Sequence, residues 1–155
     1  MKIFFDTEFI EDGKTIDLIS IGMVREDGKR FYAENSECAL ARADDWLKQN
    51  VFPHLVGEKA WMTRSEIREA VVDFAGEKPK FWAYYADYDW VVLCQLHGRM
   101  IDLPEGWPRY CRDLKQLLDD VGNPRVPKQA ADEHNALQDA LWVKETWELV
   151  KDNYV

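Results

Sequence analysis

The feature that most constrains this chain is an apolar segment near its start that ends in two acids. The run Ile3–Phe5 is followed directly by Asp6, Thr7 and Glu8. Such a run predicts a buried strand, and residues two apart in a strand point to the same side. Asp6 and Glu8 are therefore expected side by side where the strand leaves its sheet. Adjacent carboxylates repel unless a proton or a cation lies between them, although a solvated strand end is the alternative interpretation.

The order of the predicted elements indicates a mixed α/β fold. Strands are expected near 2–9, 15–25 and 30–33, separated by turns at 11–14 and 26–29, which predicts an antiparallel meander. Helices and strands then alternate, with helices expected at 39–49, 63–75, 87–96, 113–121 and 135–151, and strands at 81–85 and 109–112. In the first helix, Leu40, Ala43, Trp46 and Leu47 should form one apolar face. We predict a single domain, residues 1–155, with a mixed five-stranded sheet flanked by helices.

The composition excludes several classes of protein. The chain has 155 residues, of which 46% are hydrophobic, and this suits one globular domain. No apolar run approaches the roughly 20 residues of a membrane span, so no membrane association is expected. The absence of a recognisable signal peptide, together with three cysteines and no CxxC, favours a cytoplasmic location. The net charge of −9 argues against broad phosphate contacts, but not against an enzyme whose carboxylates hold metal ions.

Two predicted helices carry an acid on the side that should face the core. Asp89 shares its helical stripe with apolar residues three, four and seven positions later, and Asp139 repeats the pattern. A buried carboxylate is costly unless it is hydrogen-bonded, paired or bound to a metal, and neither helix has a basic residue one turn away. Backbone hydrogen bonding is the alternative for either acid alone, and Asp87 is expected to be an N-cap. With Asp6 and Glu8, these residues indicate four acids converging on cations.

A histidine precedes the last predicted helix. His134 comes directly before Asn135, which is expected to be the N-cap of that helix. His134 then belongs to the preceding loop and can lean over the acids independently of the helix. Imidazole accepts a proton near neutral pH, so His134 is a candidate general base. A surface histidine without a chemical role is the alternative.

The acids and the histidine fall into three motifs with a familiar order and spacing. The motifs are Asp6-Thr7-Glu8, Tyr88-Asp89 and His134-Asn135-Ala136-Leu137-Gln138-Asp139. They resemble the three exonuclease motifs of the DEDD superfamily, which includes RNase T, oligoribonuclease and the proofreading subunit of DNA polymerase. The His-x4-Asp form resembles the histidine subclass. The short chain, Phe9 directly after Glu8 and the tryptophan-rich middle look most similar to the small bacterial 3′-5′ exoribonucleases first defined in mycobacteria.

The resemblance implies an RNase H-like fold and a metal-dependent exonuclease that removes nucleotides from the 3′ end of single-stranded RNA by two-metal hydrolysis. Two Mg²⁺ or Mn²⁺ ions are implied, which suits hard oxygen ligands. Asp6, Glu8 and Asp139 would hold the first ion, and Asp6 would bridge to the second. Asp89 would act on the second ion, and His134 would take a proton from the attacking water. The chain departs from many relatives before Asp89: they have Asn or His among these residues, where this chain has Tyr84-Tyr85-Ala86-Asp87.

Candidate substrate contacts flank these motifs. Thr7, Phe9 and Trp90 adjoin the acids of the first two motifs, and the two aromatic residues are candidates to stack on bases. Arg125 and Lys128 lie in the loop before the last helix and are candidates to contact phosphate. Core packing is the alternative for the aromatic residues, and a solvated loop is the alternative for the basic ones.

Several functional alternatives stay open at this stage. The motifs are shared by enzymes that act on RNA and on DNA, so a 3′-5′ single-stranded DNA exonuclease is the nearest alternative. A non-catalytic nucleic-acid-binding or metal-binding module would keep the acids but would not need the histidine. A structural domain without a ligand would not be stabilised by Mg²⁺ or Mn²⁺. A homodimer is compatible with the resemblance, but no stretch of the sequence identifies an interface.

Overall fold

A mixed six-stranded sheet forms the centre of the computed structural model, which describes residues 1–129 and 133–153. The strand order is β4-β3-β2-β1-β5-β6. The first three strands are antiparallel, as predicted, whereas β5 runs parallel to β1 and β6 runs parallel to β5. The strands are β1 (Lys2–Glu11), β2 (Ile16–Arg25), β3 (Arg30–Asn35), β4 (Trp61–Met62), β5 (Lys80–Ala83) and β6 (Arg112–Asp113).

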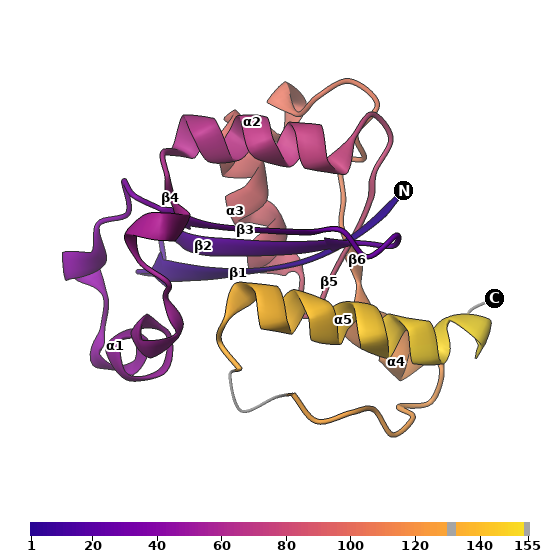
Figure 1. Cartoon of the computed structure of the whole chain (residues 1–155). Coiled ribbons are helices and arrows are strands. Elements are labelled where there is room, and N and C mark those ends of the chain that lie inside the picture. Colours follow the sequence, from indigo (N-terminus) through magenta and orange to yellow (C-terminus); the bar gives the residue numbers. More distant parts are fainter. Residues whose placement is uncertain (130–132, 154–155) are drawn as a thin grey trace.

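The helices lie on both sides of the sheet. In Figure 1, α2 and α3 cover one side, α4 and α5 cover the other, and α1 lies at the end of the sheet near the start of α5. The helices are α1 (Asp45–Asn50), α2 (Arg64–Ala75), α3 (Asp87–His97), α4 (Leu114–Asp120) and α5 (Ala136–Val150). Short 3₁₀ turns cover Leu40–Arg42, Phe52–His54, Glu58–Ala60, Met100–Asp102 and Lys151–Asn153.

The predicted count of five strands is one too low because of β4. This strand has two residues, Trp61 and Met62, and it pairs in parallel with Glu34 and Asn35 at the end of β3. Two residues cannot display an alternating pattern, so nothing in the sequence marks this strand. The strand closes the edge of the sheet only at the carboxyl end of β3.

The helix predicted at 39–49 is wrong over its first half. The segment forms a 3₁₀ turn and then an extended residue, Ala43, before α1 begins. Asp44 caps α1, since its side chain accepts a hydrogen bond from the backbone N–H of Leu47 at 2.8 Å. The predicted apolar face is also not formed, because Leu47 is buried whereas Trp46 is 51% exposed. A good N-cap residue inside an apolar pattern therefore made the helix begin later than the pattern suggested.

Alternate residues of β1 anchor the two layers on either side of the sheet. Phe5 belongs to the core under α2 and α3, and its ring meets Phe81 of β5 edge-on at 5.8 Å between centroids. Phe4 points to the other side, where its ring lies 5.6 Å from Trp147 of α5. Each fully buried phenylalanine contributes about 1.5–3 kcal/mol through removal of apolar surface from water. Packing from both sides therefore fixes β1 directly before its two acids.

A β-bulge interrupts the pairing of β1 with β2 beside the acids. Glu8 pairs with Ser20, but Phe9 pairs with Leu18, so Ile19 is the extra residue. Such a bulge changes which side of the sheet the following side chains face. Ile19 thereby joins Ile10 in a small separate core that is completed by Ala43, Leu47 and Val51. The bulge thus creates a second, smaller apolar platform, and this platform carries α1.

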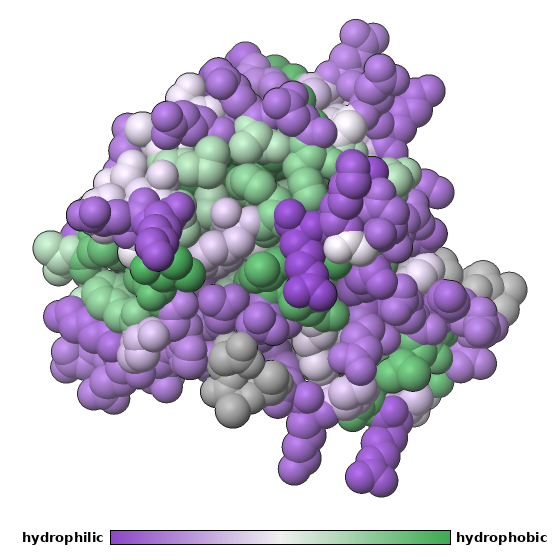
Figure 2. All heavy atoms as spheres, in the orientation of Figure 1, coloured by the Kyte–Doolittle hydropathy of each residue, from purple (hydrophilic) through white to green (hydrophobic). Residues whose placement is uncertain are grey.

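The face of the molecule seen in Figure 1 is mostly polar. Figure 2 shows one face on which polar residues predominate and hydrophobic residues gather towards the middle. No helix in the described ranges is both long enough and apolar enough to cross a membrane.

Candidate active site

The four acids and His134 line one pocket of about 540 Å³. Asp6 and Glu8 project from the same side of β1, Asp89 lies in the first turn of α3, and Asp139 lies in the first turn of α5. The structure therefore brings together three segments that are more than 40 residues apart in the sequence. Thr7 and Phe9 line the same pocket.

Asp89 is held by the residue that lies between the two acids of β1. The backbone N–H and the hydroxyl of Thr7 both donate to Oδ1 of Asp89, at 3.0 and 2.5 Å. Asp89 is 6% exposed, and burial raises the pKa of its carboxyl to about 7 even though the Thr7 hydrogen bonds lower it. The Thr7 hydroxyl is therefore already bound within the protein. This supports a role for Thr7 in holding Asp89, rather than the contact with substrate that the sequence suggested.

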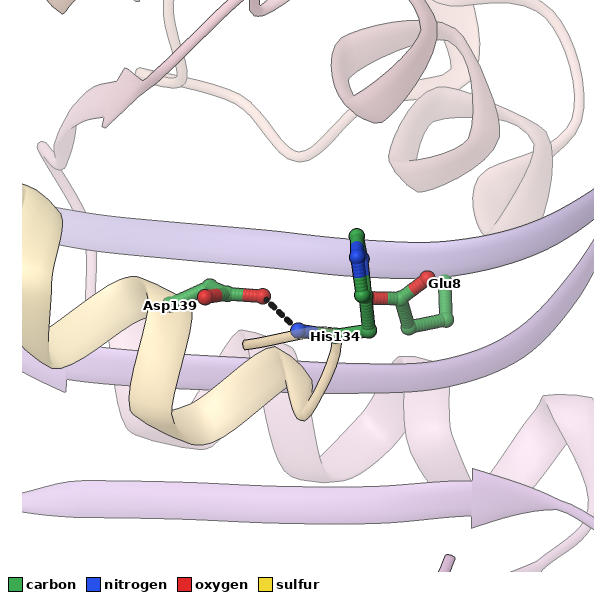
Figure 3. Close-up of side chains that lie close together, drawn as sticks. All are labelled: Glu8, His134 and Asp139. Atoms are coloured by element: carbon green, nitrogen blue, oxygen red, sulfur yellow. Dashed lines mark hydrogen bonds between the residues drawn. The ribbon is translucent and has the colours of Figure 1, made fainter. Parts of the chain in front are cut away.

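Asp139 and His134 are joined through the backbone at the start of α5. The N–H of His134 donates to Oδ2 of Asp139 at 2.9 Å (Figure 3). The side-chain amide of Gln129 donates to Oδ1 of the same acid at 3.2 Å. Asn135 is the N-cap, as predicted, because its side chain accepts hydrogen bonds from the next turn of the helix. His134 has a φ of +74°, a left-handed conformation that side chains rarely adopt. Burial raises the pKa of Asp139 to about 6.

Gly22, which our reading of the sequence did not single out, allows α5 to reach the acids of β1. Gly22 pairs with Asp6 in the sheet. A Cβ atom at Gly22 would lie 2.3 Å from the backbone nitrogen of Leu137 and 2.4 Å from the carbonyl of Ala136. The first turn of α5 therefore rests directly on the backbone of β2, and this close approach places Asp139 beside Asp6. An isolated glycine in a strand pattern is the one available signal for such an approach.

The charges of the pocket suit divalent cations. One ligand atom each from Glu8, His134 and Asp139 lies within 4.8 Å of the others, and Figure 3 shows these side chains gathered together. Burial and the neighbouring acids raise the pKa of Glu8 to about 9 and hold the pKa of Asp6 well above its usual range. Among the described lining residues there is no lysine or arginine to offset these carboxylates. Several hard oxygen donors without a protein cation are a fitting donor set for a hard divalent cation.

The raised pKa values predict that the metal-free protein loses stability as pH rises. A carboxyl whose pKa is higher in the folded state stabilises that state while protonated, and this contribution is lost as pH rises through the folded pKa. Between about pH 6.5 and 9.5, Asp89 and then Glu8 lose their protons in the folded protein, whereas the same groups are already ionised in the unfolded chain. We expect Tm in chelator to fall by roughly 5–10 °C over this range.

The same melting experiment has a built-in control. Adding Mg²⁺ or Mn²⁺ at about pH 8.5 should restore the lost Tm, because a bound cation replaces the missing protons. Differential scanning calorimetry at a series of pH values, with chelator and with each ion, measures both effects. A Tm in chelator that is constant or rises across this range would contradict the account of the acids.

Of the aromatic and basic residues predicted to contact substrate, Phe9 lines the pocket and the other three do not. Phe9 lies in the pocket, with its ring 5.9 Å from that of Tyr88. Trp90 is instead 9% exposed and packs on Phe81 in the core, so its placement supports the core alternative. Arg125 and Lys128 are exposed and are not among the residues that line the pocket.

The pocket is also lined by aromatic residues that the sequence did not identify as candidates for the site. They are Trp46 of α1, Tyr84 and Tyr85 after β5, and Trp142 of α5. Tyr85 has a φ of +53° and is 62% exposed.

Asp87 was predicted to be the N-cap of α3, but it is the first residue of the helix, and Ala86 is the N-cap. The strained turn at Tyr85 explains the difference. Asp113 of β6 accepts hydrogen bonds from the N–H groups of Tyr85 and Ala86 in this turn.

Comparison with known proteins is consistent with this arrangement. Residues 1–151 match the family model described as the 3′-5′ exoribonuclease Rv2179c-like domain. Two relatives from two strains of Mycobacterium tuberculosis, both named 3′-5′ exoribonuclease, are 44% identical over 146 residues, which is 90% of this chain and 87% of each relative. The matched region contains the three motifs and every acid of the pocket. The chain therefore belongs to the Rv2179c-like 3′-5′ exoribonuclease domain family.

Proposed function

We propose that this protein is a 3′-5′ exoribonuclease that removes nucleotides from the 3′ end of single-stranded RNA by metal-dependent hydrolysis. The observation that carries the proposal is the convergence of Asp6, Glu8, Asp89 and Asp139 on one pocket with His134 at its edge. Membership of a family described as 3′-5′ exoribonucleases supports the same direction and the same substrate. A non-catalytic nucleic-acid-binding or metal-binding module could keep the four acids but would not need His134 beside them.

The proposal includes an RNase H-like fold in a single domain and the histidine subclass of the DEDD superfamily. The antiparallel meander β1–β3, followed by the parallel strands β5 and β6, supports the fold assignment. The placement of His134 five residues before Asp139, with its N–H bonded to that acid, supports the subclass.

The residues divide into those that would hold the ions and those that handle substrate and protons. Asp6, Glu8 and Asp139 would hold one Mg²⁺ or Mn²⁺ ion, and Asp6 and Asp89 would hold a second. Divalent ions at such a site lower the pKa of water and offset the charge of the scissile phosphate. His134 accepts the proton of the attacking water, and Asp139 keeps the backbone of His134 in place. Phe9 offers an aromatic surface in the pocket on which the terminal base stacks.

The test is incubation with oligonucleotides labelled at the 5′ or the 3′ end, made of RNA or DNA, with Mn²⁺, with Mg²⁺ and with excess chelator. A 5′-labelled single-stranded RNA should shorten one nucleotide at a time, and a 3′-labelled RNA should release labelled mononucleotide from the first moment. Chelator should stop both reactions. Preference for the DNA oligomers would favour the deoxyribonuclease alternative, and cleavage that persists in chelator would exclude the proposed mechanism.

A further inference from the structure

We propose that Trp46 is a positioning residue for His134, holding the imidazole at the edge of the pocket where it can accept a proton. This inference rests on the proposed function, because it assigns Trp46 a task in the same reaction. Trp46 belongs to α1, far from the three motifs in the sequence, and nothing in those motifs points to it.

The contact between the two rings is direct. Their centroids are 5.0 Å apart and the planes are inclined at 80°, which is an edge-to-face arrangement. Aromatic pairs favour this geometry, and it biases a side-chain equilibrium by about 2- to 10-fold. Both residues line the pocket that holds the four acids.

His134 needs such support because its other constraint acts on the backbone. Its N–H is bound to Asp139, and its φ of +74° fixes the direction in which the side chain leaves the chain. Within residues 1–129 and 133–153, the structure assigns no hydrogen bond to the ring nitrogens of His134. Rotation of the ring about its side-chain bonds is therefore restrained mainly by packing, and the indole of Trp46 provides that packing.

The backbone of α1 on both sides of Trp46 is anchored, as a positioning residue requires. The neighbouring Leu47 is buried in the small core formed by Ile10 and Ile19, and Asp44 caps the helix. The segment that follows α1 is tied to the start of α5, because the side-chain amide of Asn135 donates to the carbonyl of His54 at 3.2 Å. The two rings thus sit on elements that are joined to each other.

The first test is the kinetics of single substitutions on single-stranded RNA. Trp46→Ala should lower kcat by about 5-fold or more with little change in KM, and Trp46→Phe should recover most of the loss because a ring remains. Trp61→Ala is the matched control: Trp61 is 52% exposed, nearly the same as Trp46, but does not line the pocket. That variant should keep wild-type kcat and KM. A raised KM with unchanged kcat in Trp46→Ala would overturn the proposal and make Trp46 a substrate contact.

A double-mutant cycle with His134→Asn separates positioning from stacking. If Trp46 acts through His134, then Trp46→Ala should cost less than about 2-fold in kcat once the imidazole is gone. If Trp46 contacts substrate directly, its loss should have the same effect in both backgrounds, and the proposal would be wrong.

A measurement that does not depend on catalysis keeps this inference distinct from the proposed function. The chain has three histidines, so the ring signals of His134 can be assigned in a proton NMR spectrum by their disappearance in His134→Asn. Trp46→Ala should shift those signals and leave the signals of His97, which packs on Trp107, unchanged, whereas Trp61→Ala should leave those of His134 unchanged. Unmoved His134 signals would overturn the positioning role. An inactive wild-type protein with the expected shifts would instead count against the proposed function alone.

Discussion

Asp6→Asn should lower kcat on single-stranded RNA by about 10³-fold or more while the fold stays intact. Asp6 is the central acid of the pocket, since its pKa is raised first by burial and then by Asp89, Glu8 and Asp139 together. An amide keeps the shape of the side chain but removes the charge that would bring two divalent ions to one phosphate. Loss of such electrostatic stabilisation typically costs several kcal/mol of activation free energy.

The same substitution should make the metal-free protein more stable above about pH 7, because it removes one of four repelling carboxylates. Calorimetry in chelator should show a higher Tm than wild type, and the gain from added Mg²⁺ should shrink. Asp27→Asn is a suitable control, because Asp27 is exposed and pairs with Arg25 away from the pocket. A variant that retains a tenth of wild-type kcat, or that loses its far-UV circular dichroism, would contradict this assignment of Asp6.

Gly22→Ala should destabilise the protein by about 3 kcal/mol and reduce activity together with stability. The added Cβ would fall 2.3–2.4 Å from backbone atoms of Ala136 and Leu137, and backbone atoms cannot rotate away as a flexible side chain can. Either the sheet or α5 must shift, and α5 carries Asp139. The expected loss of stability is opposite to the usual effect, because alanine usually stabilises a strand interior relative to glycine by roughly 0.5–1 kcal/mol.

Gly13→Ala provides the comparison for Gly22→Ala. Gly13 lies in the turn after β1, where a Cβ would meet nothing within 4 Å, although its φ of +82° is unfavourable for alanine. Its substitution should cost about 1–2 kcal/mol through backbone strain alone and leave kcat unchanged. Urea unfolding of both variants, with kcat measured on the folded protein, tests the difference. Equal losses of unfolding free energy in the two variants, or a normal kcat in Gly22→Ala, would contradict the prediction. Either result would show that α5 can shift to accept the Cβ atom without displacing Asp139.

The sequence revealed those parts of the fold that depend on local patterns. The alternation in β1 placed Asp6 and Glu8 on one side, and the capping chemistry of Asn135 marked the start of α5. The acid on the inward stripe of α3 was also recognisable, because burial of Asp89 conflicts with its charge unless something satisfies it.

The parts that stayed hidden depend on contacts between distant segments. The strand β4 is too short for any pattern, and the close approach at Gly22 exists only because α5 returns to β2. Trp46 and Trp90 show that position in the sequence does not tell which tryptophan lies at the site. Neighbouring acids made Trp90 look like a substrate contact although it packs in the core, whereas Trp46 reaches the pocket through the placement of α1.

The small core under α1 supports one wall of the pocket separately from the two larger cores. It joins α1 to the bulged ends of β1 and β2 and is separate from the two larger cores that hold the sheet together. Segments with few buried apolar contacts open locally at a lower free-energy cost than the whole domain. Local opening of this small core would therefore displace α1 and Trp46 before it disturbed the acids of β1, which the two larger cores hold in place.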